Sequence, residues 1–578
     1  MSRQAKRKQK PQLIQWRLRV VVGAVLLLFF CLMARAAYIQ VIEPDMLRQQ
    51  SDMRSLRTTS REVQRGLITD RNGEMLAVSV PVRAVIADPK EVIEKNGFAD
   101  MRRWQALADI LHQPVDQLVA RVKENPNRRF IYLARQVTPA VGDYIKNLKI
   151  KGIGQRAESR RYYPAGEITA QVIGITNIDD VGIEGLERNY NDWLTGTPSK
   201  EKVRKSRDGH VVERLDTVQE GERPNDLVLS IDQRIQQLAY RELKRATEMN
   251  QATAGSAVVI DVHTGEVLAM VNTPSYNPNS RESLQPFRMR NKALTDTFEP
   301  GSTIKPFVMA AALEAGVVND SDLVNTSPGW MRIGGRQVRD SRNYGEMSLA
   351  KILVKSSNVG ISKLALAMPV EQLLGTYYSM GLGNYSGINL TGENAGLIRE
   401  QHRWSDFERA TLSFGYGLTA TPLQLARMYA TLGAGGVLRP VSILKLKKVP
   451  EGEQVLDPQV ARDVMNMLVG VTESGGTATQ AHIEGYPVAG KTGTSRKAVA
   501  GGYGDDYVAL FAGVAPVHNP RLAIAVVIDE PKGDRYYGGD VAAPVFASVM
   551  AGSLQMLNVE PISQQQKLQL VAAGGKAE

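Results

Sequence analysis

Cysteine is almost absent from this chain of 578 residues. The single cysteine, Cys31, lies in an apolar stretch near the N-terminus. Everything after that stretch has no thiol, which excludes both a disulfide framework and a cysteine nucleophile there.

Histidine is also scarce, and its six residues are scattered along the chain. None has a spacing typical of metal ligands, such as H-E-x-x-H. The sequence therefore predicts no metal site and no cofactor. The six are His112, His210, His263, His402, His482 and His518.

Acidic residues are missing from positions 1–19, which hold seven lysines and arginines. The whole chain has a net charge of +11, so removing these seven leaves +4 for everything that follows. So small an excess does not predict a basic face for DNA or RNA. We expect no nucleic-acid partner.

One long apolar run follows the basic head. Residues 20–33 are uncharged, and the apolar character resumes after Arg35. The span 20–42 is long enough for a membrane helix from which Arg35 reaches the interface. A cleaved signal peptide is the alternative, because Ala34-Arg35-Ala36 resembles a cleavage site; we favour the uncleaved anchor. Basic residues 1–19 then place the N-terminus in the cytoplasm and the rest outside.

Turn chemistry in QEGERPND, residues 219–226, predicts a domain boundary. Residues 43–225 mix short helices and strands, and residues 226–560 form a larger second domain. The last segment, 561–578, is expected to be a flexible tail.

Two hairpins are predicted at the two ends of the larger domain. The first has strands at 256–261 and 266–271, and the second lies around Asn519-Pro520. Helical patterns dominate between them, and a last helix is expected near 543–557. The sequence thus predicts a multidomain α+β protein, with one sheet assembled from both ends of the domain and covered by helices.

The segment FEPGSTIKP carries a Ser-x-x-Lys spacing at Ser302 and Lys305. Three other pairs share this spacing, but each lies in a charged run, at a helix start or in a basic strand-like segment: Ser199 with Lys202, Ser348 with Lys351, and Ser442 with Lys445. Only Ser302 precedes an apolar helix, and Pro306 requires that helix to begin at about Ser302.

Spacing i, i+3 puts the Ser302 hydroxyl and the Lys305 amine on one face of a helix. Apolar burial lowers the pKa of a lysine, so a neutral amine could accept the serine proton. The pair therefore predicts a nucleophile with its base.

Two further signals follow in order. KSSNVG supplies Ser356 and Asn358, and GKTGTS supplies the sequence Lys491, Thr492, Gly493 and Thr494. Lys491 is predicted to be a fixed positive charge for an anionic substrate, and Gly493 to let a ligand backbone approach the strand. Each signal alone is weak, and their joint occurrence in this order carries the hypothesis.

This trio resembles that of the penicillin-recognising serine transferases and hydrolases. Along nearly the whole chain the sequence is similar to the class B penicillin-binding proteins, and among them to the division-specific transpeptidases of Gram-negative bacteria. The similar passages are RGLITDRNGEMLAVS (65–79), FIYLARQV (130–137), RRYYPAGE (160–167), GIEGLERNYNDWLTG (182–196), FEPGSTIKP (298–306), KSSNVGISKLALAMP (355–369) and FGYGLTATPLQLA (414–426).

The resemblance implies a non-catalytic pedestal or dimerisation domain and a transpeptidase domain with a five-stranded antiparallel sheet, helices on both its faces and a helical subdomain. Ser302 would attack the penultimate D-alanine of a peptidoglycan stem peptide, with Lys305 as base. Ser356 and Lys491 would relay protons, and Asn358 would hold the peptide. Thr494, with Thr492 and Gly493 beside it, would bind substrate.

The same resemblance implies partners. A meso-diaminopimelate amine would accept the acyl group, and β-lactams would acylate Ser302. The region before the transpeptidase domain would contact a membrane-embedded septal glycosyltransferase and other division proteins at the inner membrane, with the catalytic domain in the periplasm. Segments around Arg65 to Asp70, Arg161 and Glu184-Gly185 are expected to lock the domains together.

Three alternatives share parts of this pattern. A β-lactamase would need a group that activates water, and Glu-x-x-Leu-Asn does not occur in the chain. A D,D-carboxypeptidase differs only in using water as acceptor. A non-enzymatic division scaffold or β-lactam sensor would need acylation without turnover.

Some positions depart from the usual family pattern. Tyr486-Pro487 precedes the Lys-Thr-Gly strand, Ser495-Arg496 follows it where a small residue such as alanine is usual, and a short loop with Asp505 and Asp506 comes next. These differences suggest a paralogue specialised for particular conditions, such as acidic pH.

Overall fold

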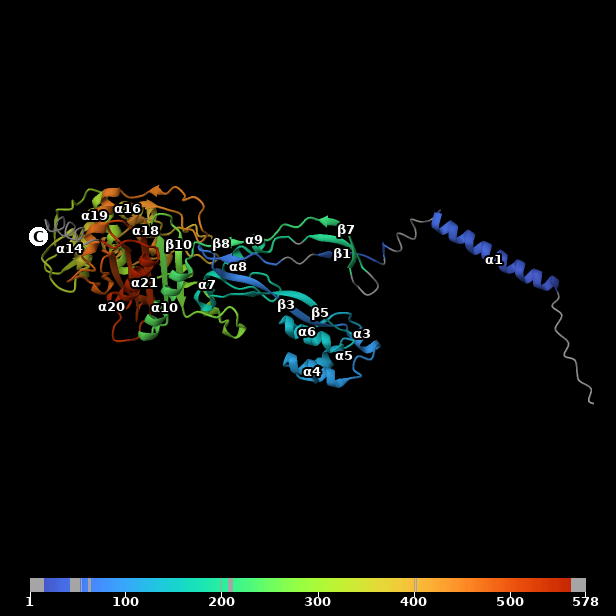
Figure 1. The fold of residues 1–578 in the computed structure, drawn as a ribbon. Coiled ribbons are helices and arrows are strands. Elements are labelled where there is room, and N and C mark those ends of the chain that lie inside the picture. Colours follow the sequence, from blue (N-terminus) through green and yellow to red (C-terminus); the bar gives the residue numbers. More distant parts are fainter. Residues whose placement is uncertain are drawn as a thin grey trace, which may run out of the picture. The chain divides into compact units, whose positions relative to one another are not determined.

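The computed structural model describes residues 15–41, 52–53, 55–60, 64–197, 199–205, 211–399, 401, 403–499 and 501–562. The chain forms two compact units. One comprises Met1–Val63 and Gly196–Arg223, and the other comprises Gln64–Thr195 and Pro224–Glu578. Figure 1 shows the ribbon coloured along the sequence.

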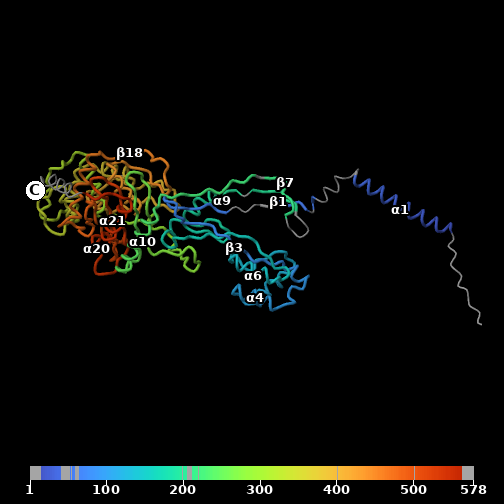
Figure 2. Tube along the Cα trace, viewed as in Figure 1, coloured from blue at the N-terminus to red at the C-terminus, as the bar shows by residue number. Residues whose placement is uncertain are grey.

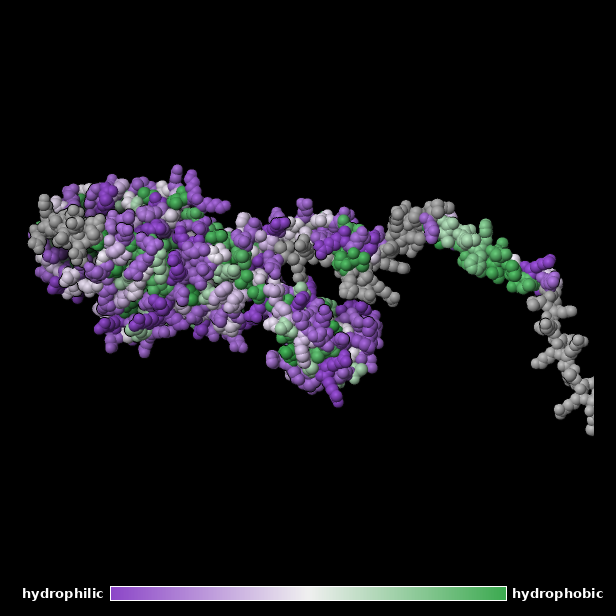
Figure 3. Space-filling model, in the orientation of Figure 1, coloured by the Kyte–Doolittle hydropathy of each residue, from purple (hydrophilic) through white to green (hydrophobic). Residues whose placement is uncertain are grey.

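The first unit contains helix α1 (Gln15–Val41) and a three-stranded antiparallel sheet of β1 (Leu56–Ser60), β6 (Lys200–Lys205) and β7 (Val211–Gln219). Within the described residues, α1 is the one helix long and apolar enough to cross a membrane. Its surface is hydrophobic along most of its length (Figure 3). The predicted apolar helix at 20–42 is confirmed up to Val41; Ile42 lies outside the described residues.

The second unit begins with a mixed sheet whose longest strand is β3 (Met75–Ala87). Helices cluster at one end of this sheet (Figure 2), where Trp104 and Leu107 are buried in a core shared with β3. The other strands are β2 (Ile68–Thr69), β4 (Ile131–Val137), β5 (Ile153–Tyr162) and β8 (Leu227–Val228), and the helices are α3 (Pro89–Glu94), α4 (Met101–Leu111), α5 (Val115–Lys123) and α6 (Pro139–Asn147).

A buried ion triad ties distant segments of this region together. The Nε atoms of Arg65 and Arg161 each lie 2.6 Å from a carboxylate oxygen of Glu187, and all three side chains are buried. Asp70 makes the contact toward the larger domain, because its carboxylate accepts a hydrogen bond from the backbone N–H of Gln233. The predicted locking of the two domains is thus seen at Asp70, whereas the triad joins segments within residues 65–187 only.

The larger domain is built on a five-stranded antiparallel sheet with the order β10-β9-β21-β20-β19. The green strands β9 (Ala254–Asp261) and β10 (Val267–Thr273) lie beside the red strands β20 (Gly502–Ala515) and β21 (Leu522–Asp529) in Figure 1, with β19 (Ala489–Val499) at the edge. Both predicted hairpins, and a sheet assembled from both ends of the domain, are confirmed.

Helices cover both faces of this sheet, and β9 and β21 are therefore buried along nearly their whole lengths. Helices α10 (Gln233–Met249) and α21 (Ala543–Met556) pack together on one face, and α18 (Pro422–Gly433) packs on the other. The helical block on the α18 side contains α12 (Lys292–Thr295), α13 (Lys305–Glu314), α14 (Leu349–Val354), α15 (Asn358–Ala367), α16 (Val370–Ser379), α17 (Asp406–Ser413) and α19 (Pro458–Val469). The predicted α+β class is confirmed.

The remaining elements are short. The helices are α7 (Ala170–Ile173), α8 (Gly185–Asn189), α9 (Asn191–Thr195), α11 (Pro286–Met289) and α20 (Gly538–Val541), and the strands are β11 (Leu323–Asn325), β12 (Trp330–Ile333), β13 (Arg336–Arg339), β14 (Glu346–Ser348), β15 (Leu397–Ile398), β16 (Leu418–Thr419), β17 (Val437–Leu438) and β18 (Glu453–Gln454).

The prediction of a loop at residues 496–506 is wrong. Residues 496–499 continue β19 and pair with residues 502–507 of β20. The ladder extends because Arg496 and Tyr507 face each other in register, and the Arg496 Nε donates to the Tyr507 hydroxyl at 3.3 Å.

Candidate active site

Ser302 lies in a single 3₁₀ turn, η3 (Gly301–Ile304), that leads directly into α13 at Lys305. The predicted helix start is confirmed, with a tighter first turn than an α-helix. Side chains at i and i+3 eclipse each other in a 3₁₀ turn, so Ser302 and Lys305 share one face. Ser302 is half-buried and Lys305 is fully buried.

The turn is fixed by close backbone packing. Gly415 has φ +85°, and a Cβ there would lie 2.2 Å from the carbonyl oxygen of Gly301. The Tyr429 hydroxyl donates to the carbonyl oxygen of Thr303 at 2.9 Å. Because Gly415 permits this close approach and Tyr429 hydrogen-bonds to the turn, the backbone around Ser302 is tightly constrained.

The Lys305 amine has three close neighbours. Its Nζ lies 2.6 Å from the Ser356 carbonyl oxygen, 2.7 Å from Asn358 Oδ1 and 3.2 Å from Ser356 Oγ. Burial lowers the pKa of Lys305 well below its usual value, and the nearby charge of Lys491 lowers it further. A neutral amine can donate its two N–H bonds to the carbonyl and amide oxygens, which leaves its lone pair for a hydroxyl proton.

Ser356 and Asn358 lie in the connection between α14 and α15. Ser356 has φ +58°, an uncommon conformation for a residue other than glycine, and this bends the chain toward Lys305. Asp340 holds the start of α15, because its carboxylate accepts hydrogen bonds from the Ser357 hydroxyl and from the backbone N–H of Asn358, both at 2.6 Å. Sequence reasoning missed Asp340, which no local motif distinguishes.

Lys491 lies in a buried environment. Its side chain is completely buried, and its Nζ donates to the Thr492 carbonyl oxygen and hydroxyl, both at 3.3 Å. Burial lowers the pKa of Lys491 to about 7. The charge of this amine therefore depends on pH near neutrality, and its role toward an anionic substrate stays a prediction.

Gly493 permits a close approach from within the chain; the approach of a ligand backbone stays a prediction. A Cβ at this position would lie 2.9 Å from both the Pro300 carbonyl oxygen and Thr303 Cγ2. The close approach that this glycine permits is thus that of the turn carrying Ser302. Beside it, the Thr494 hydroxyl accepts a hydrogen bond from the Gly538 N–H at 3.0 Å and keeps its own O–H free to donate to a ligand.

A cavity of about 500 Å³ brings most of the predicted residues together. Ser302, Ser356, Asn358, Thr492 and Thr494 line it. Lys305, Lys491 and Gly493 are buried behind this lining. The arrangement places the Ser302 hydroxyl in a polar cleft, one turn before a buried amine that contacts Ser356, which suits acyl transfer to and from serine.

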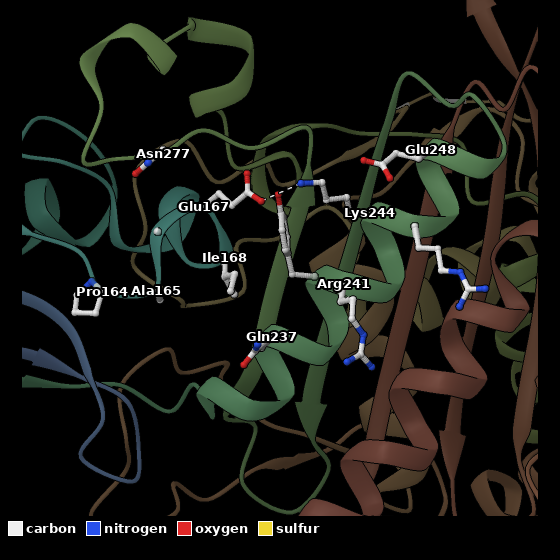
Figure 4. A pocket seen from close by; sticks show the side chains of 12 residues that line it. Pro164, Ala165, Glu167, Ile168, Gln237, Arg241, Lys244, Glu248 and Asn277 are labelled. Carbon is white, nitrogen blue, oxygen red and sulfur yellow. Dashed lines mark hydrogen bonds and ion pairs between the residues drawn. The ribbon is translucent and has the colours of Figure 1, made fainter.

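A larger cavity, of about 620 Å³, lies between α10 and the turn at residues 164–168 (Figure 4). The Lys244 Nζ donates to Glu167 across it at 2.9 Å, and Arg241 lines the same wall. Its lining contains no serine, threonine or cysteine, so size alone does not make it the reactive site.

Comparison with known proteins decides the family. Residues 255–551 match the penicillin binding protein transpeptidase domain, and residues 60–229 match the penicillin-binding protein dimerisation domain. The chain belongs to the penicillin-binding protein transpeptidase family. The resemblance inferred from the residues is thereby confirmed, and so is the pairing of a transpeptidase domain with a preceding dimerisation domain.

Relatives and solved structures of this family agree. The chain is 51% identical to peptidoglycan D,D-transpeptidase FtsI of Escherichia coli K12, over 95% of this chain and 93% of that protein. A structure of the transpeptidase domain of Burkholderia pseudomallei penicillin-binding protein 3 matches with a TM-score of 0.54 at 40% identity, covering 58% of this chain and 98% of that one. A peptidoglycan synthetase structure from Bifidobacterium adolescentis matches with a TM-score of 0.69 at 26% identity, covering 88% and 98%.

Proposed function

We propose that this penicillin-binding protein is a peptidoglycan D,D-transpeptidase that crosslinks stem peptides during septal wall synthesis. The observation that carries the proposal is the placement of Ser302 in the cavity with a fully buried Lys305 one turn later. Burial lowers the pKa of this amine well below its usual value, so its neutral form can accept the serine proton, and the serine oxygen becomes nucleophilic as it loses that proton.

In the first half-reaction Ser302 Oγ attacks the carbonyl carbon of the penultimate D-alanine. Its proton passes to Lys305, and Ser356, which contacts the same amine, relays a proton to the departing D-alanine. Thr494 donates its free hydroxyl hydrogen to the terminal carboxylate. Asn358 holds the amine through Oδ1 and keeps N–H capacity for the peptide backbone.

In the second half-reaction a meso-diaminopimelate amine attacks the ester carbonyl. The new C–N bond forms, the bond to Ser302 Oγ breaks, and the amine proton returns to that oxygen through Lys305 and Ser356. β-Lactams acylate the same serine, and no metal or cofactor takes part in these steps.

The wider assignment rests on the anchor and the family. We place residues 1–19 in the cytoplasm, 20–42 in the inner membrane, and the dimerisation region 43–225, the catalytic domain 226–560 and the tail 561–578 in the periplasm. A membrane-embedded septal glycosyltransferase and other division proteins are the proposed partners. Specialisation for particular conditions stays a prediction, tested by complementing a division-transpeptidase depletion strain at neutral and acidic pH.

The deciding experiment is mass spectrometry of the intact chain after incubation with a β-lactam. A single adduct on Ser302 is expected, and Ser302→Ala should remove it while leaving the fold intact. Ser348→Ala is the matched control, since Ser348 shares the Ser-x-x-Lys spacing but caps α14. An adduct on another residue would exclude the proposed nucleophile. Assay of stem-peptide products separates crosslinked dimer from the free tetrapeptide of a carboxypeptidase.

A further inference from the structure

The active-site cavity contains a charged group of residues that the acylation chemistry does not use. We call Lys355, Gln480 and Asp540 the distal rim; all three line the cavity. The rim adjoins β19 at Thr492, because a Cβ on Gly539, which precedes Asp540, would lie 3.5 Å from Thr492 Cγ2. The turn carrying Ser302 instead adjoins β19 near Thr494, where a Cβ on Gly301 would lie 3.7 Å from the Thr494 carbonyl oxygen.

The rim offers both signs of charge. The Lys355 ammonium donates one hydrogen bond to the Gly475 carbonyl oxygen at 2.7 Å and has two more N–H groups to give. Asp540 accepts from the Gln480 side chain at 3.4 Å, a contact long enough for a ligand donor to replace. Lys355 directly precedes Ser356, so a ligand on the rim would lie next to the proposed proton relay.

The chemistry of the second half-reaction defines what this space must hold. One amine leaves the carbonyl carbon and another attacks it, so by microscopic reversibility both follow the same path. The departing D-alanine and the reacting end of meso-diaminopimelate share one pattern, an amine and a carboxylate on a D-configured carbon. They differ in the third substituent, which is a methyl group in D-alanine and a long chain leading to the acceptor peptide in meso-diaminopimelate.

We propose that the distal rim is the binding subsite for the acceptor strand. The reacting D-centre occupies the place vacated by D-alanine, with its carboxylate at Thr492 and Thr494. The chain that replaces the methyl group runs toward the rim. There Lys355 pairs with a carboxylate of the acceptor peptide, and Gln480 and Asp540 bind its amide groups. The inference rests on the proposed transpeptidase function and adds how the acceptor is selected over water.

Two acceptors of different length test the subsite on the full chain in detergent micelles. With a pentapeptide donor, incorporation of isotopically labelled D-alanine measures exchange at the leaving-group position alone. A meso-diaminopimelate tetrapeptide reads crosslinking, which also needs the rim. Lys355→Gln is expected to lower dimer formation relative to D-alanine exchange about tenfold, the effect of losing one hydrogen bond to a charged group.

Lys351→Gln is the matched control, because Lys351 lies on α14 one turn earlier and is exposed outside the cavity. It should keep the wild-type ratio of dimer to exchange, and Asp540→Asn should lower that ratio as Lys355→Gln does. Equal loss of both products in Lys355→Gln, or an unchanged ratio, would overturn the rim assignment alone. A wild-type enzyme that hydrolyses the donor without transfer to either acceptor would overturn the transpeptidase function itself.

Discussion

The Nζ of Lys305 lies 2.7 Å from the Oδ1 of Asn358, and both side chains meet at the start of α15. An uncharged amide is the partner that lets a buried lysine stay neutral. A carboxylate in the same position would favour the ammonium form.

Asn358→Asp should therefore raise the pKa of Lys305 and remove its capacity as a base at neutral pH. We expect the rate of β-lactam acylation at pH 7 to fall roughly 100-fold, because each unit of pKa is a factor of ten in the neutral fraction. Measured from pH 6 to 10, the acylation rate of the variant should rise at higher pH than that of the wild type. Coincident profiles would show that Asn358 does not control this amine.

Stability should also depend on the two buried lysines. The folded-state pKa values of Lys305 and Lys491 are lowered, so between the folded and unfolded pKa the unfolded chain binds more protons. The free energy of unfolding should then rise with pH from about pH 7 toward 9, by about 1.4 kcal/mol per pH unit for each such lysine. This contribution is lost as the pH falls through about 7 for Lys491.

Lys491→Met should flatten that dependence by removing one titrating group. The measurement is thermal unfolding of both chains in detergent at several pH values. Parallel curves for the variant and the wild type would contradict the burial argument for Lys491.

Gly493→Ala should push the nucleophile's turn away from β19. A Cβ would contact the Pro300 carbonyl oxygen at 2.9 Å, and a backbone atom cannot move aside cheaply. We expect a loss of about 1–3 kcal/mol of stability and slower acylation. Gly375→Ala is the matched control: Gly375 lies in α16 with nothing within 4 Å of an added Cβ, so the change should be neutral or slightly stabilising. Equal effects of the two substitutions would argue against the close packing.

Glu187→Ala should destabilise the dimerisation region without touching the nucleophile. Removing this carboxylate leaves the buried guanidinium groups of Arg65 and Arg161 without their shared ion partner. The free energy of unfolding should fall by about 3–5 kcal/mol, because a buried charge without a partner is less stable than a site that holds no ion pair. Limited proteolysis should detect faster cleavage within residues 64–195. The fraction of the variant that remains folded should still form the β-lactam adduct on Ser302.

Local patterns were sufficient to predict the hairpins and the Ser302 turn. Short continuous apolar runs bounded by turn residues indicate buried strands, and Pro306 can be accommodated only near a helix start, so both follow from nearby residues. The environments of Lys491 and Gly493 could not be predicted in this way. Pro300 and Thr303, which pack against Gly493, lie far away in the sequence, and a strand pattern does not say which segment packs against it. The role of Asp340 could not be predicted for the same reason, since its hydrogen-bond partners belong to the later helix α15.

The order of strands in the catalytic sheet has a consequence for biogenesis. β21, made from residues 522–529, inserts between β9 and β20, so the first hairpin has no neighbour on that side until residues 522–529 have been synthesised. Any product that terminates before this strand would leave β9 with an open edge, prone to pair with other chains. Premature stops before codon 522 should thus yield aggregated or degraded polypeptide, and no partially active enzyme.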